Sequence, residues 1–192
     1  MGTFLLAVLL AQAALGQPST AEEYLQRGET RAGAHDYSGA IEDYNMALQL
    51  KRDYAEAFND RGHSYYWKGP KDKAIADFTR AIELRQNYPN AFNNRGAAYF
   101  ASGGKYELAL ADFNEAIRQK PDFRNAYVNR ANLNLRYYNW RQSLEDFHHA
   151  GMYPERTAAL VGGVTLLFAG AGAFWLVRLR RRRLAARHRG GV

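Results

Sequence analysis

An arginine followed by a small residue recurs along the middle of this chain at a nearly fixed interval. These arginines are Arg27, Arg61, Arg95 and Arg130, so the intervals are 34, 34 and 35 residues; glycine follows the first three and alanine the fourth. A fixed period of this length is typical of stacked helical repeats, in which each unit buries its apolar face against its neighbours. The sequence therefore predicts an array of four units.

A second series, made of a small residue, an aromatic residue and another small residue, runs in register with the first. It begins 12, 12, 13 and 12 residues after the small residue that follows each arginine, so the third unit has one additional residue. We place this insertion at Gly103-Gly104. The series consists of Ala40, Tyr44 and Ala47, then Ala74, Phe78 and Ala81, then Ala109, Phe113 and Ala116, then Ser143, Phe147 and Ala150.

Each unit divides into two amphipathic helices. In the second unit, Gly62 and Tyr65 lie on one face of a helix, and Ala74 and Phe78 lie on one face of another. Gly69-Pro70 interrupts the helical pattern between them. The small residues allow the two backbones to approach closely, and the aromatic ring fills the space beside them.

This pattern resembles the tetratricopeptide (TPR) repeat, whose signature is an aromatic residue, a small residue and a tyrosine, followed by alanine, an aromatic residue and alanine. The resemblance implies an all-α solenoid of four helix-turn-helix repeats that acts as a non-enzymatic scaffold for protein partners. Arg31 and Asn134 stand where Tyr65 and Tyr99 stand in the middle units, and terminal repeats are commonly atypical. The four copies cover residues 21–54, 55–88, 89–123 and 124–157.

Apolar segments flank the expected repeat domain, residues 17–157. Residues 1–16 are apolar, too short to span a bilayer and end in small residues, as in a secretory signal peptide. Residues 158–177 are 20 uncharged, mostly apolar residues, which is the length of a membrane-spanning helix. With the tail at 178–192, the sequence predicts a repeat domain anchored by one C-terminal transmembrane helix.

Charge predicts the orientation of this anchor. The tail holds seven arginines and no acidic residue, so 19 of the 26 basic residues precede it and balance all 19 acidic ones. A cluster of arginines beside a membrane span stays in the cytoplasm, which places the repeats outside it, as in a bacterial cell envelope. The repeats carry no excess of positive charge, and we expect no nucleic-acid partner.

The sequence contains no pattern of catalytic or metal-binding residues. It has no cysteine, no phosphate-binding loop, no HExxH motif and no GxSxG motif. His148 and His149 are adjacent on a helix and point about 100° apart, which is unfavourable for one metal ion. We expect a protein that is not an enzyme and that has no cofactor and no bound metal.

The repeated arginines have a matching set of acidic residues. An aspartate precedes the aromatic residue of each second helix, and four equivalent copies favour a structural ion pair over a catalytic site. We expect Arg61 to lie near Asp77 and Arg95 near Asp112. Two alternatives stay open: a pairing with the next unit, such as Asp43 with Arg61, or a row of arginines that binds a ligand. The aspartates are Asp43, Asp77, Asp112 and Asp146.

The exposed residues of the first helices, which line the concave wall of a TPR-like stack, are rich in asparagine. A carboxamide both donates and accepts hydrogen bonds, so a row of them can bind the backbone of an extended peptide. Tyr66, Trp67 and Phe100 would serve as apolar anchors. The alternative is that asparagine merely suits a solvated helix face. The predicted groove residues are Asn59, Asp60, His63, Tyr66, Trp67, Asn90, Asn93, Asn94, Phe100, Asn125, Asn129 and Asn132.

The leading hypothesis is a membrane-tethered interaction module that binds a peptide segment or a partner subunit. Alternatives are a surface protein whose C-terminal segment, after Pro154-Glu155, is a sorting or processing signal, and a cytoplasmic tail-anchored adaptor. Some TPR domains hold acidic chaperone tails through lysines and asparagines, but Leu25, Glu29 and Glu56 occupy the nearby face here. The resemblance therefore does not extend to that ligand.

Overall fold

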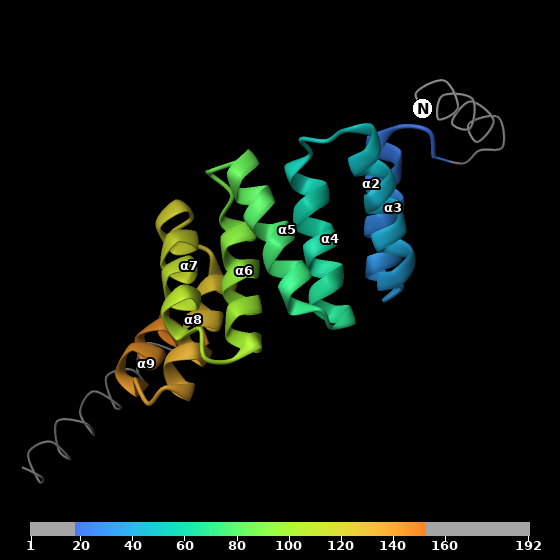
Figure 1. The fold of residues 1–192 in the computed structure, drawn as a ribbon. Helices are drawn as coiled ribbons and strands as arrows, with labels where there is room; N and C mark the ends of the chain where they lie inside the picture. Colours follow the sequence, from blue (N-terminus) through green and yellow to red (C-terminus); the bar gives the residue numbers. More distant parts are fainter. Residues whose placement is uncertain (1–17, 153–192) are drawn as a thin grey trace, which may run out of the picture.

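The computed structural model describes residues 18–152, and this part of the chain is helical throughout, with no strand. Consecutive helices pack in pairs, α2 with α3 through α8 with α9, and each pair is one of the expected units (Figure 1). The all-α solenoid of helix-turn-helix repeats is therefore confirmed. The helices are α2 (Ala21–Gly33), α3 (Tyr37–Leu50), α4 (Ala55–Lys68), α5 (Lys71–Leu84), α6 (Pro89–Ser102), α7 (Tyr106–Gln119), α8 (Arg124–Arg136) and α9 (Trp140–His149).

The segments at both ends lie outside the described residues. These are the expected signal peptide at 1–16, the apolar segment at 158–177 and the basic tail at 178–192. Between residues 18 and 152, no helix is long and apolar enough to cross a membrane. Export and membrane anchoring thus stay predictions from the sequence.

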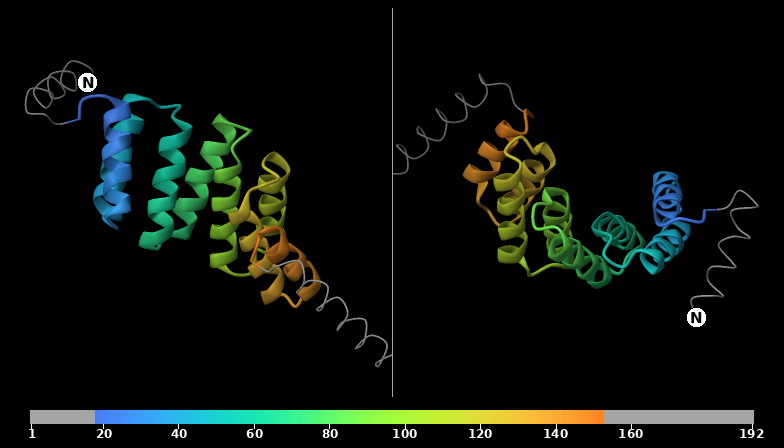
Figure 2. Two further views of the ribbon diagram at one scale, coloured as in Figure 1. Left: turned by 180° about the vertical axis from the view of Figure 1, so that it is seen from behind. Right: turned by 90° about the horizontal axis from the view of Figure 1, so that it is seen from above.

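The stack is curved, and the first helix of each unit lies on the inner side of the curve. Seen from above, the helices follow an arc (Figure 2). The first helices touch one another in sequence, α2 with α4, α4 with α6 and α6 with α8, whereas the described second helices make no such contacts. The inner wall is therefore built from α2, α4, α6 and α8, as the repeat pattern predicts.

Glycine at the centre of the first helix allows the two helices of a unit to pack closely. A Cβ atom on Gly62 would lie 2.9 Å from the ring of Phe78 and 3.2 Å from the carbonyl oxygen of Ala74. On Gly96 it would lie 2.8 Å from the ring of Phe113. These rings are 1% and 0% exposed. The close approach inferred from the sequence is confirmed.

The fourth unit departs from this arrangement. Ala131, which is 0% exposed, occupies the position of the glycines. Phe147, the corresponding ring, is only half-buried. No further unit follows α9 within the described residues, which leaves this ring less covered than Phe78 or Phe113.

The third unit joins its helices through two glycines. Three residues, 103–105, join α6 to α7, as 34–36 join α2 to α3 and 137–139 join α8 to α9, whereas Gly69 and Pro70 alone join α4 to α5. Gly103 and Gly104 have φ angles of 74° and 67°, in the left-handed region that glycine adopts without steric cost. The length of this connector does not by itself locate the additional residue, so its placement at Gly103-Gly104 stays a prediction.

Exposed apolar side chains gather in the last unit. Leu144 and Phe147, which the sequence leaves without a cover, are half-buried in the structure. Other large apolar residues of this unit are 42% to 91% exposed. An array that ends in this way needs a cover from another molecule or segment. The exposed residues are Leu135, Tyr137, Tyr138, Trp140 and Met152.

We predict that a soluble fragment ending at Gly151 self-associates, because this apolar surface is then open to other copies. The same fragment with a polar capping helix fused to its end should be monomeric. Analytical ultracentrifugation compares the two. If both are monomers, the fourth unit needs no cover.

We predict that Gly96→Ala destabilises the fold by about 1–3 kcal/mol, because the added methyl group meets a buried ring. Gly33→Ala is the matched control, since a Cβ at Gly33 would meet nothing within 4 Å. Its better helix propensity should stabilise the fold by up to about 1 kcal/mol. Unfolding of the full chain in detergent, followed by circular dichroism, measures both. Equal changes would contradict the packing argument.

Candidate functional site

Each repeated arginine forms an ion pair with the aspartate of its own unit. In all four units the Nε and Nη2 atoms of the arginine donate to the two carboxylate oxygens, a bidentate geometry that is strong and directional. The aspartate side chains are 8% exposed or less. The expected pairing is confirmed. The shortest N–O distances are 2.5 Å for Arg27–Asp43, 2.7 Å for Arg61–Asp77, 2.8 Å for Arg95–Asp112 and 2.6 Å for Arg130–Asp146.

The arginines also connect neighbouring units. Arg61 Nη1 donates to Asn45 Oδ1 of the preceding unit over 2.7 Å, and Arg95 Nη1 donates to Thr79 Oγ1 over 3.2 Å. Arg130 Nη1 makes the corresponding bond to an asparagine, Asn114, over 2.5 Å. The contact between units therefore runs to the residue two positions after the aspartate, and the alternative pairing of Asp43 with Arg61 is wrong. These arginines hold the array together instead of forming a row for a ligand.

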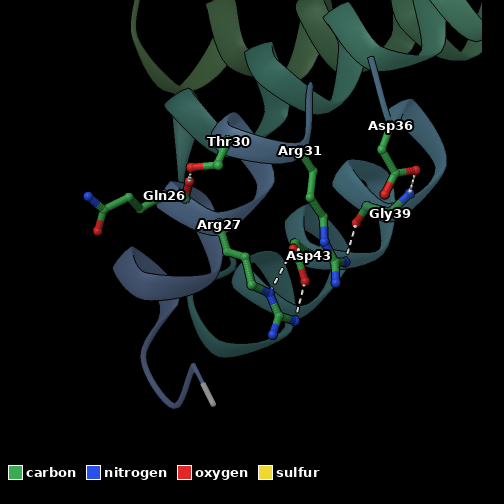
Figure 3. Close-up of polar contacts among 7 residues, drawn as sticks. All are labelled: Gln26, Arg27, Thr30, Arg31, Asp36, Gly39 and Asp43. Carbon is green, nitrogen blue, oxygen red and sulfur yellow. Dashed lines mark hydrogen bonds and ion pairs between the residues drawn. The ribbon is translucent and has the colours of Figure 1, made fainter. Parts of the chain in front are cut away.

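The first unit adds a second arginine to its aspartate. Figure 3 shows Arg27 and Arg31 converging on Asp43 and the α3 backbone. Arg31 Nη1 lies 3.1 Å from Asp43 Oδ2 and donates to the carbonyl oxygen of Gly39 over 3.1 Å. Arg31 stands where the middle units have tyrosine, so this departure from the repeat pattern strengthens the polar contact within a terminal unit.

The fourth unit replaces the same tyrosine by a buried asparagine. Asn134 accepts a hydrogen bond from the Tyr106 hydroxyl over 3.1 Å and donates to Asp146 Oδ2 over 3.4 Å. Because Asn134 is only 1% exposed, both of these bonds satisfy buried polar groups. This substitution also links α8 to the preceding α7.

The inner wall contains a hollow of about 410 Å³ between α4, α6 and α8. The structure brings seven of the predicted groove residues together in its lining: His63, Tyr66, Trp67, Asn93, Asn94, Asn125 and Asn129. Sequence reasoning missed three apolar residues of the lining, Phe78, Ala97 and Val128. Phe78 belongs to the repeat signature, which predicts a core residue, and its 1% exposed side chain also lines the hollow.

The other predicted groove residues lie elsewhere. Asn59 and Asp60 are on α4 beside the hollow and contact each other. Asn90 and Asn132 are exposed but do not line the hollow. Phe100 packs against the core formed by Ala109, Phe113 and Leu133, so its placement as an anchor in the groove is wrong for the hollow observed here.

Five of these polar residues form a continuous chain of hydrogen bonds across three units, which we call the amide relay. Asn129 donates to Asn93 over 2.9 Å, Asn93 to Asn94 over 3.4 Å, Asn94 to Asn59 over 3.1 Å, and Asn59 to Asp60 over 2.9 Å. A carboxylate can only accept, so Asp60 fixes the orientation of Asn59 and, through it, of every amide in the relay.

The relay changes the expected role of the asparagines. Asn59 and Asn93, each 6% exposed, connect the first helices of neighbouring units and are largely structural. Asn94 and Asn129 serve the relay and also line the hollow, whereas Asn125 lines the hollow, is exposed and stands outside the relay. The interpretation of the asparagines as a solvated face is therefore wrong for the relay members, because they hold one another.

Aromatic rings form the α4 side of the hollow. The Trp67 indole nitrogen donates to His63 Nε2 over 3.0 Å, and the edge of Tyr66 lies against the Trp67 ring at 5.5 Å between centroids. Tyr37, at the start of α3, lies nearly parallel to Trp67 with the centroids 6.5 Å apart. Desolvation lowers the pKa of His63, so the ring is neutral at pH 7 and accepts the indole hydrogen.

The surroundings of Asp60 disfavour the charged form of its carboxyl group. Burial raises the pKa of Asp60 to about 6, and the nearby carboxylates of Glu29 and Glu56 add to this effect, whereas the hydrogen bond from Asn59 opposes it. No cation is among the groups that shift this pKa. Perturbed carboxyl groups of this kind are common at binding sites.

We predict that Asp60→Asn stabilises the fold at pH 7. The pKa of Asp60 is about 6 in the folded state and near its ordinary value of 3.8 in the unfolded chain. This residue therefore lowers the unfolding free energy as the pH rises from 4 to 7. The Asp60→Asn variant does not lose this unfolding free energy, so it should be about 1–3 kcal/mol more stable at pH 7. Unfolding at pH 4.5 and pH 7 measures it, with the exposed Asp72→Asn as control. If the difference in unfolding free energy between the Asp60→Asn variant and the unmodified chain is the same at both pH values, the prediction is wrong.

Comparisons with known proteins agree with this architecture. The family model described as TPR repeat matches residues 35–69 and 62–103. No curated protein matches the chain. A crystal structure of MamA is 24% identical with a TM-score of 0.66, and the alignment covers 78% of this chain and 86% of MamA. The repeat signature is therefore supported by both sequence and fold.

Two further solved structures have the same fold. The first TPR of Spaghetti (RPAP3), solved with the HSP90 peptide SRMEEVD, is 22% identical with a TM-score of 0.59, over 62% of this chain and 94% of that one. The Arabidopsis OM64 TPR domain is 22% identical with a TM-score of 0.59, over 61% of this chain and 96% of that one. At these identities the likeness concerns the fold.

Proposed function

We propose that this chain is a tetratricopeptide-repeat protein that acts as a membrane-tethered scaffold, performs no chemistry and holds a peptide segment or subunit of a partner protein. The observation that carries the proposal is the hollow on the inner wall, which lies between three units and combines carboxamides with an exposed tryptophan. Pockets that place a few polar groups among apolar ones are typical binding sites.

The chemistry of the hollow suits a polypeptide. Asn94, Asn125 and Asn129 offer amide donors and acceptors that match the N–H and C=O groups of an extended backbone. Trp67 offers a large apolar anchor. The RPAP3 domain, which has the same fold, is bound to a peptide, and this supports a peptide as the class of ligand.

The proposal includes the membrane and the location. Residues 158–177 would span the bilayer, the seven arginines of the tail would remain in the cytoplasm, and the repeats would face the other side. A scaffold of this kind suits assembly of proteins at a bacterial cell envelope. Its support is the order of the segments in the sequence: an apolar start, neutral repeats, an apolar span and a basic end.

We predict that a photo-crosslinking amino acid at position 125 captures a partner polypeptide in intact membranes, because Asn125 lines the hollow and is exposed. The same amino acid at Glu107, which is exposed on α7 and outside the hollow, is the matched control. Asn125 is preferable to Asn94 or Asn129, whose replacement also breaks the amide relay. Capture at position 107 but not at 125 would contradict the proposal.

We also predict that a single cysteine at position 72 reacts with a membrane-impermeant maleimide on intact cells, whereas one at position 191 reacts only after lysis. The chain has no cysteine of its own, so each variant carries one thiol. The reverse labelling would indicate a cytoplasmic adaptor. The mass of the mature protein shows whether the chain is cleaved. Loss of both the N-terminal and the C-terminal segment would indicate a sorted surface protein.

A further inference from the structure

We infer that anionic lipid headgroups cover the open end of the array, so that the fourth unit lies flat on the membrane and the hollow stands directly above it. This inference rests on the membrane anchor of the proposed function and specifies how the repeats are oriented on the bilayer. Three observations carry it: the open end is apolar and aromatic, exposed arginines accompany it, and the sequence leaves a short tether between it and the expected span.

The open end of the array is a surface that a further unit would cover. In the third unit, three apolar residues pack against a core that includes Leu133 of the next unit. These three are Phe100, Tyr106 and Leu110. The residues at the corresponding positions of the fourth unit, which we call the terminal face, are Leu135, Trp140 and Leu144. No helix follows α9 within the described residues to cover them, and Leu135 and Trp140 are exposed.

The turn that leads into α9 adds aromatic rings with polar atoms. Tyr138 is 91% exposed and stands where the third unit has Gly104. The φ angles of these two residues are 63° and 67°, so glycine would form the same turn at less steric cost and the turn itself does not require a tyrosine. Tyrosine and tryptophan rings are enriched at the level of lipid headgroups, where the apolar ring and the polar atom are both satisfied.

The charge of the fourth unit favours an anionic surface. Residues 123–144 contain four arginines and no acidic residue. Arg130 is held by Asp146. The other three are exposed and form no ion pair among residues 18–152: Arg124, Arg136 and Arg141. Exposed cations of this kind are attracted to the headgroups of anionic lipids.

The two ends of the stack differ in charge. Residues 21–54 contain seven acidic and four basic residues, whereas residues 124–152 contain two acidic and four basic ones. The acidic unit contains α2, which lies at the opposite end of the stack from α9 (Figure 1). An anionic membrane therefore attracts the end that adjoins the expected span and repels the other, which favours an upright stack.

The tether is too short to keep the fourth unit away from the lipid. Residues 153–157 separate Met152 from the expected span, and five residues reach at most about 18 Å. Helix α9 has ten residues and is therefore about 15 Å long. The distance from the end of the tether to the far end of α9 is thus similar to the reach of the tether, so the whole terminal face can lie on the headgroups.

A second copy of the chain is a less favourable cover. In a symmetric pair each terminal face meets its own equivalent, which brings the exposed arginines of the two copies together, whereas anionic headgroups neutralise them. The self-association predicted for the soluble fragment is what this face does when lipid is missing. On the membrane, Asn125 and Asn129 of α8 hold the hollow close to the headgroups, so the partner segment must lie near the bilayer.

The test uses the full chain in vesicles of phosphatidylcholine with or without about 30% anionic phosphatidylglycerol. A fluorophore on Asn139→Cys reports contact with lipids that carry a nitroxide quencher on the headgroup. Position 139 lies at the far end of α9 from the tether, so it reaches the headgroups only if the terminal face lies flat. The matched control is Lys105→Cys, the equivalent position of the third unit; neither side chain caps its helix. Quenching at 139 should be at least about twofold stronger than at 105, and stronger with phosphatidylglycerol.

Two pairs of substitutions test which side chains make the contact. Tyr138→Gly with Trp140→Ser removes the aromatic rings, and Arg136→Gln with Arg141→Gln removes two charges. Each pair should reduce the quenching at 139 by about half or more. The controls, which change an exposed apolar residue and an exposed cation of earlier units, are Leu108→Ser and Lys73→Gln and should have no effect. Circular dichroism excludes unfolding as the cause of a loss.

Quenching at 139 that is no stronger than at 105, equal with and without phosphatidylglycerol, or unchanged by both pairs would overturn the inference. A bis-maleimide that links position 139 of two copies without quenching would assign the face to a second copy and overturn it as well. The proposed function is judged separately: if the chain resists extraction from the vesicles by alkaline carbonate and position 125 captures a partner, only the orientation is wrong. Extraction of the chain would contradict the membrane anchor itself.

Discussion

The array depends on a guanidinium group that contacts three helices at once. In the second unit, Arg61 pairs with Asp77 on the other helix of its unit and reaches back to Asn45 in the unit before. A planar group with five donors can make both contacts, which a lysine at this position could not. The same side chain therefore links the two helices of its unit and the unit before, and Arg95 and Arg130 repeat both contacts.

The inner wall is a consequence of that regularity. Because equivalent residues return in every unit, asparagines at two adjacent positions of the first helices lie close enough to bond one another from α4 to α8. The side chains of the amide relay hydrogen-bond one another and so stabilise the wall. Asn125 and Trp67 line the hollow outside the relay and are exposed to a ligand.

Much of the fold was predictable from the sequence because a repeat offers the same signal four times. The small residue and the aromatic ring at a fixed offset indicated the packing of Gly62 on Phe78, and the change of offset indicated one additional residue in the third unit. The site was less predictable. Asn90 and Phe100 share the helix of Asn93 and Asn94, yet one is exposed away from the hollow and the other packs into the core.

The sequence by itself determined the number of units and favoured the pairing of each arginine with the aspartate of its own unit, because these follow from local periodicity and from the chemistry of opposite charges. Only the tertiary structure decided that this pairing within a unit is the one made, which asparagines bond to each other, and that Phe78 lines the hollow. These features depend on the distance and rotation between successive units, which arise from packing among side chains far apart in the chain and leave no periodic signal in it.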